Sequence, residues 1–185
     1  MVKTIIQRFL LGIWMIVLFF GLWYYWFYPE LFTTQNLKVF FERFNTLMLW
    51  VYLLVSIVRG FALIPSTPFV FAGLLLFSWE MVFLISMIGI LASATLLYFF
   101  AEFLEFDQFL EKKYPQEIKK LKHLMQRKGV VIVFLWSFFP AVPTDLICYV
   151  AGILRMPFGL FLLALGLGES ILVGLYVFLG TTLMV

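Results

Sequence analysis

Long apolar stretches recur along the chain, separated by two polar connections at Pro29–Arg43 and Glu105–Lys128. The apolar stretches are, approximately, Phe9–Tyr28, Leu47–Ile64, Phe69–Trp79, Met81–Leu104, Val130–Leu154 and Phe158–Val185. Hydrophobic residues make up 64 % of the 185 residues and charged residues 12 %, whereas about a quarter of a soluble domain is charged. So little polar surface cannot coat a globule in water. We therefore predict a single all-α integral membrane domain spanning residues 1–185.

The first apolar stretch is predicted to be a retained transmembrane helix over residues 4–28. Lys3 and Arg8 lie at its start, and it ends in the aromatic cluster WYYWFY rather than in a small-residue cleavage site. Its length of about twenty residues fits a bilayer. Its terminal aromatic residues fit the interfacial belt of a membrane helix.

Residues 105–128 are predicted to form a cytoplasmic amphipathic helix, with Pro115 in a first turn. One face collects the apolar residues Ile118, Leu121, Leu124 and Met125. The basic residues, which we expect to contact anionic lipid, are Lys112, Lys113, Lys119, Lys120, Lys122, Arg127 and Lys128. The positive-inside rule places this helix and the N-terminus in the cytoplasm of a multi-pass cell-membrane protein.

This placement requires an even number of membrane crossings between the N-terminus and residue 105. The first helix and Met81–Leu104 supply two. Phe69–Trp79 covers about eleven residues and therefore about 16 Å of helix, half of a hydrocarbon core of about 30 Å. We therefore predict that residues 44–104 form a re-entrant helical hairpin followed by a transmembrane helix.

Residues 129–185 are predicted to repeat this arrangement as a second hairpin followed by a helix. Both units contain Pro-x-x-Pro followed by Ala-Gly. The predicted hairpin-tip residues are Pro65, Pro68 and Gly73 in the first unit and Pro140, Pro143 and Gly152 in the second. Hairpins that open to opposite sides form an inverted-topology repeat, typical of transporters with a site between broken helices. The alternative is that the prolines kink two spanning helices.

Charged residues inside the apolar stretches are the candidate site residues. A central Asp costs about 2.5–3.5 kcal/mol to insert, so Asp145 needs a partner or a function. Arg59 precedes the first proline pair, and Glu169 lies midway along the last apolar stretch. For Arg155, snorkelling to the interface competes with a role in the site. A charged substrate group in a wet cavity would explain the other three residues, and so would a structural Asp–Arg pair.

Residues for soluble-enzyme chemistry are scarce. His123 is the single histidine and lies in the most charged stretch, and Cys148 is the single cysteine. The sequence contains neither a Gly-rich phosphate loop nor an HExxH motif. We therefore expect no catalytic residues, cofactor, metal or nucleic-acid partner, and homo-oligomerisation stays open.

Two motifs resemble the DedA family and the wider VTT-domain superfamily, which includes SNARE-associated Golgi proteins. They are IPSTPFVFAGLLLF at Ile64–Phe77 and the sequence FFPAVPTDLICYVAG that ends at Gly152. Gly89 and Tyr98 resemble the helix that follows the first motif in the family. The resemblance adds Tyr149 to the candidate site.

The sequence also departs from the family pattern. Ser137 stands where family members usually carry an arginine, and Glu102 stands where a basic residue is often found. The family is associated with moving lipids between leaflets, by phospholipid scrambling or by transport of undecaprenyl phosphate or phosphatidylethanolamine. The resemblance implies such an activity without fixing the lipid, and the missing arginine means that its role cannot be transferred.

The leading interpretation is a lipid transporter or scramblase that moves a phosphate-bearing lipid between leaflets. In this interpretation Asp145, Arg59 and Glu169 receive the head group while the tails stay in the membrane. One alternative is a proton- or ion-coupled exporter of small solutes on the same scaffold. Another is a non-transport membrane scaffold whose helix at Lys112–Lys128 binds anionic lipid or a partner.

Overall fold

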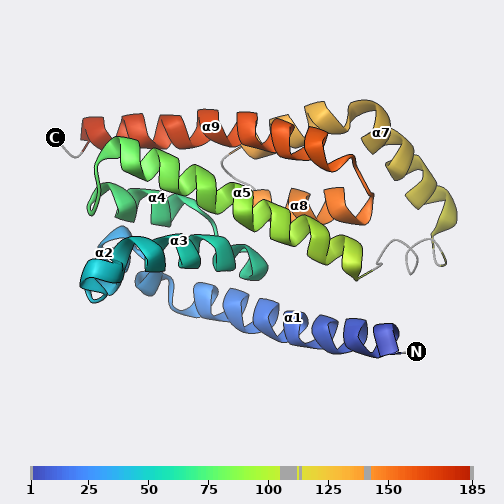
Figure 1. The fold of residues 1–185 in the computed structure, drawn as a ribbon, viewed down its shortest axis with the longest axis horizontal. Coiled ribbons are helices and arrows are strands. Elements are labelled where there is room, and N and C mark those ends of the chain that lie inside the picture. The colour runs from blue at the N-terminus through green and yellow to red at the C-terminus, as the bar shows by residue number, and fades with distance from the viewer. Residues whose placement is uncertain (1, 105–111, 113, 140–142, 184–185) are drawn as a thin grey trace.

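The computed structural model describes residues 2–104, 112, 114–139 and 143–183, and this part of the chain is helical without strands (Figure 1). Its elements are α1 (Val2–Phe27), η1 (Pro29–Phe32), α2 (Thr34–Glu42), η2 (Asn45–Leu47), α3 (Met48–Val58), η3 (Arg59–Ala62), α4 (Thr67–Leu74), α5 (Trp79–Phe103), α7 (Pro115–Phe138), α8 (Thr144–Ile153) and α9 (Phe158–Leu183). The predicted all-α fold class is confirmed.

Four helical stretches are long and apolar enough to cross a membrane. They are Phe9–Phe27, Asn45–Ala62, Trp79–Phe103 and Phe158–Thr182. Large apolar side chains such as Phe9, Trp26 and Phe178 are exposed on them. An apolar surface of this extent requires lipid rather than water around it, so the chain is a multi-pass membrane protein.

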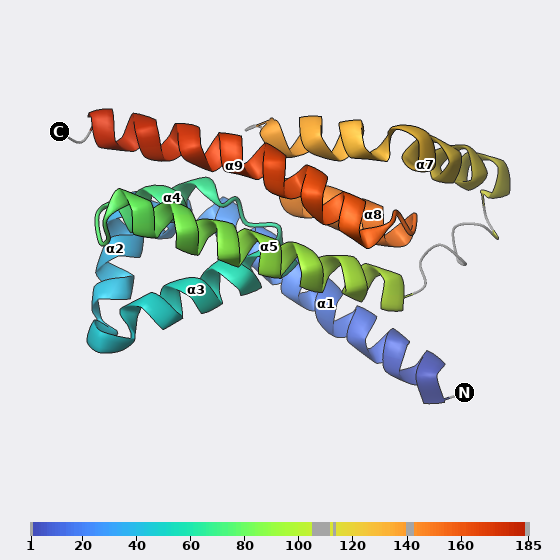
Figure 2. The same ribbon diagram turned by 45° about the horizontal axis from the view of Figure 1, so that its top comes forward.

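The long helices run between two ends of the molecule, and the shorter helices stop between them (Figures 1 and 2). The N-terminus, the C-terminal end of α5 and the beginning of α7 lie at one end. The C-terminus and α2 lie at the other end. In both views α4 lies beside α5 and α9 towards the α2 end. Helix α8 lies towards the opposite end, where it packs on α5 and α7.

The connection Pro29–Arg43, predicted to be polar, contains a helix with a buried face. Thr33 caps α2, because its side chain accepts a hydrogen bond from the backbone amide of Asn36. Leu37 and Phe41 of α2 are buried, and the helix packs on α4. Leu37 and Phe41 are four residues apart, so they lie on the same face of α2.

Helix α7 continues without interruption from Pro115 to Phe138, across the predicted boundary at residue 128 between the cytoplasmic helix and the second hairpin. Pro115 does occupy the first turn, as predicted. Gly129 does not break the helix there, because its α-carbon lies against Met156, whose Sδ is 3.0 Å from an ideal Cβ at this position. Residues 105–111 and Lys113 lie outside the described residues.

The apolar face predicted for this helix is divided in the structure. Ile118 and Met125 are buried within the protein, whereas Leu121 and Leu124 are exposed. The exposed pair can contact lipid, and the buried pair anchors α7 to the rest of the fold.

Each half of the molecule has a close helix–helix contact between a glycine and a serine. An ideal Cβ on Gly89 of α5 would lie 2.9 Å from Ser56 Cβ of α3, and one on Gly168 of α9 would lie 2.8 Å from Ser137 Cβ of α7. Each glycine stands at the same distance from the start of its helix. Small residues at such crossings let membrane helices approach closely. The matching positions support the internal repeat that the sequence predicts.

Candidate functional site

A cavity of about 100 Å³ lies between the two halves of the chain, and Pro65 and Pro143 are among the residues that line it. Its polar lining residues are Arg59, Ser66, Thr67, Thr144, Asp145, Glu169 and Tyr176. They come from both halves of the chain, on or next to η3, α4, α8 and α9. A cavity needs roughly 10–15 Å³ to hold one water molecule. This cavity therefore has room for several waters or for a phosphate-sized group.

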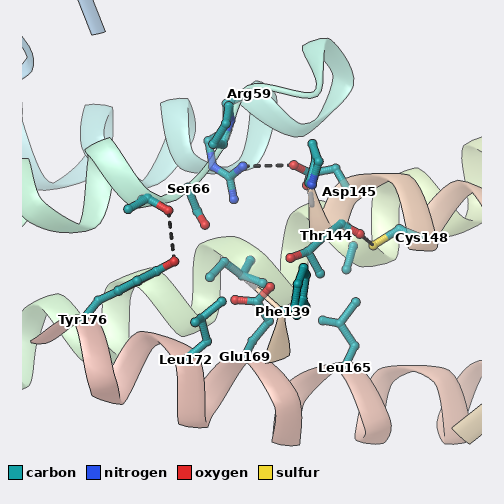
Figure 3. Close-up of a pocket in the computed structure, with 15 residues that line it drawn as sticks. Arg59, Ser66, Phe139, Thr144, Asp145, Cys148, Leu165, Glu169, Leu172 and Tyr176 are labelled. Atoms are coloured by element: carbon teal, nitrogen blue, oxygen red, sulfur yellow. Dashed lines mark hydrogen bonds and ion pairs between the residues drawn. The ribbon is translucent and has the colours of Figure 1, made fainter. Parts of the chain in front are cut away.

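A buried ion pair joins the two halves at this cavity. Arg59 Nη1 lies 3.0 Å from Asp145 Oδ2 (Figure 3). The two residues are 7 % and 6 % exposed. Arg59 Nη1 also donates a hydrogen bond to the backbone oxygen of Ile64, at 2.6 Å. Arg59 therefore holds the first proline loop and the first turn of α8 together through one guanidinium group.

Glu169 brings a second acid to the cavity from the middle of α9. The residue is 1 % exposed, and its Oε2 atom is buried without a hydrogen-bond partner among the described residues. Figure 3 shows the carboxyl pointing from α9 into the space between Ser66 and Thr144. Because Arg59 and Asp145 balance each other, Glu169 in its carboxylate form would be an uncompensated charge in this cavity.

Both short helices begin at the cavity. The first residues of α4 and α8 are Thr67 and Thr144, and both line it. The Thr67 hydroxyl donates to the Tyr176 hydroxyl at 3.3 Å. A helix N-terminus carries partial positive charge and unpaired N–H groups, so two converging N-termini favour a negatively charged group between them.

Backbone conformation brings the first short helix to this position. Leu63 has φ 55°, in the left-handed region, and its amide bonds to the Gly60 oxygen at the end of η3. This ends the helix and redirects the chain into Pro65 and Ser66. A left-handed non-glycine residue is uncommon, and the Arg59 bond to Ile64 helps to hold this turn.

The structure brings together three of the predicted site residues and two of the predicted hairpin-tip prolines. Arg59, Asp145 and Glu169 line one cavity, together with Pro65 and Pro143. Of the other two prolines, Pro68 lies in the first turn of α4, and Pro140 lies outside the described residues.

Two predicted hairpin-tip glycines lie elsewhere. Gly73 is in the last turn of α4, where an ideal Cβ would lie 2.8 Å from the Tyr52 hydroxyl. Gly152 is near the end of α8, where a Cβ would collide with the Tyr98 backbone oxygen. Neither glycine lies in the turn that precedes its short helix. They serve close helix packing, which the Ala-Gly pattern alone does not distinguish from a tip.

Tyr149 and Arg155 do not line this cavity. Tyr149 instead accepts a hydrogen bond from Trp14 Nε1 of α1, at 2.8 Å. Arg155 is exposed in the turn after α8, with φ 53°. The sequence also did not indicate Ser66, Thr67, Thr144 and Tyr176 as lining residues. Both motifs place a threonine next to a proline, and this shared pattern could have indicated Thr67 and Thr144.

The Trp14–Tyr149 bond fastens α1 to the second half of the molecule. The two rings are 5.1 Å apart, and α1 packs on η3, the element that carries Arg59. Gly21 permits this packing, since an ideal Cβ would lie 2.6 Å from Ala62 Cβ. Helix α1 therefore packs against the element that carries Arg59 of the buried ion pair.

Replacing Tyr149 by Phe is expected to lower the free energy of unfolding by about 0.5–1.5 kcal/mol, because the partly buried hydrogen bond from Trp14 Nε1 to the Tyr149 hydroxyl is lost. Denaturant unfolding in detergent measures this difference, and Tyr24→Phe on the exposed side of α1 is the matched control. A second Trp14→Phe substitution should add little to Tyr149→Phe. Full additivity of the two substitutions would show that the bond does not hold α1.

Comparison with known proteins gives two matches. The VTT domain matches residues 64–182. An uncharacterized protein of Methanocaldococcus jannaschii is 32 % identical over 114 residues, which cover 61 % of this chain and 71 % of the relative. No solved structure matches the chain significantly. The VTT-domain match at residues 64–182 contains both proline motifs, Asp145 and Glu169. Arg59 and α1 precede this match.

Proposed function

Because this chain belongs to the VTT-domain (DedA/SNARE-associated Golgi protein) family, we propose that it moves a phosphate-bearing lipid, a phospholipid or polyprenyl phosphate, between membrane leaflets. The observation that carries this proposal is the cavity at which α4 and α8 begin. It combines two helix N-termini, a guanidinium group and a volume suited to a head group. We propose transport without covalent chemistry, so the protein is not an enzyme.

In this proposal neither short helix crosses the membrane. Helices α4 and α8 contain 8 and 10 residues, about 12 and 15 Å of helix, which is at most half of a hydrocarbon core of about 30 Å. The first re-entrant hairpin is α3, η3 and α4, and the second is the C-terminal half of α7 with α8. Helices α1, α5 and α9 cross.

The phosphate would enter the cavity between the two N-termini, near Arg59. Unpaired backbone N–H groups and a cation favour a phosphate there. The acyl or prenyl chains would stay in the surrounding lipid, because a cavity of about 100 Å³ has no room for them. Breaking and remaking the Arg59–Asp145 contact would let the head group pass.

The proposed orientation has the N-terminus and the beginning of α7 in the cytoplasm of the cell membrane. Both lie at the same end of the molecule (Figure 1). The basic side chains of α7, among them Lys119, Lys120 and Lys128, would then contact anionic lipid head groups of the inner leaflet. The opposite end carries α2 and the C-terminus.

A second candidate function is an ion-coupled exporter of small solutes. It is favoured by the Glu169 carboxyl, because its Oε2 atom has no hydrogen-bond partner among the described residues and is therefore available to bind a coupling ion. Transport that requires a proton or sodium gradient would support this candidate. Transport of lipid without any gradient would support the scramblase.

The test is flipping of fluorescent phospholipid in proteoliposomes without an ion gradient, with wild type and Asp145→Asn compared. Wild type should flip the lipid, and Asp145→Asn should lose at least about tenfold in rate, since the guanidinium would lose its charged partner. Glu80→Gln, which changes an exposed acid in the first turn of α5, is the control and should flip as wild type does.

Correct folding of each variant is checked by size-exclusion chromatography in detergent. No flipping by well-folded wild type, with or without a gradient, would overturn the transport proposal. Normal flipping by folded Asp145→Asn would overturn the path through this cavity. If instead α7 charge removal alone abolished a cellular function, the membrane-scaffold interpretation would be favoured.

A further inference from the structure

We propose that Glu169 is the binding site for one exchangeable proton, and that only the protonated carboxyl admits an anionic group to the cavity. The first half of this inference concerns the carboxyl alone and does not depend on lipid transport. The second half rests on the proposed function and names its regulation.

The geometry of Glu169 distinguishes it from the other acid of the cavity. Asp145 is committed to Arg59 at 3.0 Å. Protonating Asp145 would leave a guanidinium group buried without its counter-charge, which is strongly unfavourable. Glu169 Oε2 has no partner among the described residues, so a proton can join it and leave it without breaking a contact that the structure shows.

The other groups around the cavity do not neutralise a Glu169 carboxylate. Charged or titratable side chains reach the cavity from η3 with Arg59, from α8 with Asp145 and Cys148, and from α9 with Tyr176. The lining residues of α4 and α5 carry no titratable side chain. Arg59 and Asp145 cancel, and the thiol and phenol are neutral near pH 7. The charge of the cavity therefore alternates between minus one and zero with Glu169.

Binding of a proton and binding of an anion in this cavity are consequently linked. A carboxylate and a phosphate in one small low-dielectric space repel each other, so each disfavours the other. Protonation of Glu169 removes the repulsion and adds a hydrogen-bond donor for a phosphate oxygen. Linkage is reciprocal, so a bound anion also favours the protonated carboxyl.

The described residues contain no group of three or more His, Cys, Asp and Glu side chains that could hold a metal ion. A single carboxylate among neutral hydroxyls is suited to a monovalent cation rather than a divalent one. The proton and an alkali ion such as Na⁺ are then the two competitors, and the experiment separates them.

The test uses a hydrophobic carbodiimide, which reacts with protonated carboxyl groups in membranes. The full chain is reconstituted in vesicles of a neutral lipid, treated at a series of pH values, and digested for mass spectrometry. The peptide with Glu169 should gain the reagent mass at low pH. Its labelling should fall by about tenfold per pH unit once the carboxyl deprotonates, as expected for a single titrating group. In Glu169→Gln the adduct should be absent, whereas Asp145 should stay unlabelled in both proteins.

Three results would overturn the inference. Labelling of Asp145 in preference to Glu169 would assign the proton to the ion pair. Labelling of Glu169 that does not change with pH would show that the site does not exchange a proton. Protection by Na⁺ but not by choline at constant pH would make the ligand an alkali ion.

The regulatory half is tested by flipping at the same pH series. Wild-type flipping of an anionic fluorescent lipid should fall as pH rises and labelling is lost, while Glu169→Gln should show no dependence on pH over this range. Retained pH dependence in folded Glu169→Gln would overturn the linkage. If no flipping occurs at any pH while labelling behaves as expected, the proton site stands and the proposed function fails.

Discussion

Asp145→Ala is expected to lower the free energy of unfolding by about 3–5 kcal/mol, because it leaves the Arg59 guanidinium buried without its counter-charge. The partners are 3.0 Å apart and almost wholly buried, so water cannot compensate. Arg59→Ala should be comparably damaging, since Asp145 then stays unpaired and the Ile64 carbonyl loses its donor. Denaturant unfolding in detergent micelles measures both effects.

A double variant and a surface pair serve as controls. Arg59→Met combined with Asp145→Leu should recover most of the stability, because two apolar residues replace the pair without a buried charge. Glu42→Ala removes the exposed ion pair that Lys38 forms with Glu42 at 3.7 Å, and should cost at most about 0.5 kcal/mol. Single variants as stable as wild type would contradict the structural role of the pair.

Gly168→Val is expected to destabilise the protein by about 1–3 kcal/mol through overpacking. An ideal Cβ at Gly168 would lie 2.8 Å from both the Phe134 backbone oxygen and Ser137 Cβ. Backbone cannot move aside as the end of a flexible side chain can, so α7 and α9 would have to separate. The readout is the denaturation midpoint in detergent.

Gly159 on the same helix provides the matched control. An ideal Cβ there has no neighbour within 4 Å among the described residues, so Gly159→Val should change stability far less than Gly168→Val. The repeat predicts a loss of similar size for Gly89→Val, because Gly89 meets Ser56 in the first half. Equal effects at Gly168 and Gly159 would show that the crossing does not depend on the glycine.

Predictions from the sequence are most reliable for residues that cost much free energy to bury in a membrane, because few environments can accommodate them. A buried Asp or Arg inside an apolar stretch must be paired or used, and Arg59 and Asp145 do pair. Helix class and the length of α1 follow from composition and from the apolar length. The prolines mark the breaks before α4 and α8 for a similar reason, since Pro removes a backbone donor.

Other features depend on tertiary contacts that local patterns do not contain. Helix α7 continues through Gly129 because Met156 packs there. Gly73 and Gly152 resemble turn residues in the sequence but allow close contact with Tyr52 and Tyr98. Trp14 is one aromatic residue among many in α1, and its bond to Tyr149 follows from how α1 lies across the fold.

The position of Ser137 illustrates how the chain differs from the family pattern. The family's arginine would stand in the second half, near the end of α7. Here Ser137 is buried, donates to the Val133 backbone oxygen at 2.8 Å and packs against Gly168. The buried cation of the cavity instead comes from the first half as Arg59, and its acid comes from the second half as Asp145.

The central claim is that α3 with α4, and the C-terminal half of α7 with α8, enter and leave the membrane as hairpins while α1, α5 and α9 cross it. Sidedness of the two termini tests this most directly. Reporter fusions that are active on only one side of the membrane are attached to the N-terminus and, separately, to the C-terminus of the full chain. Three crossings predict opposite sides for the two termini. If all four candidate spans crossed, both termini would lie on the same side, and that result would contradict the account.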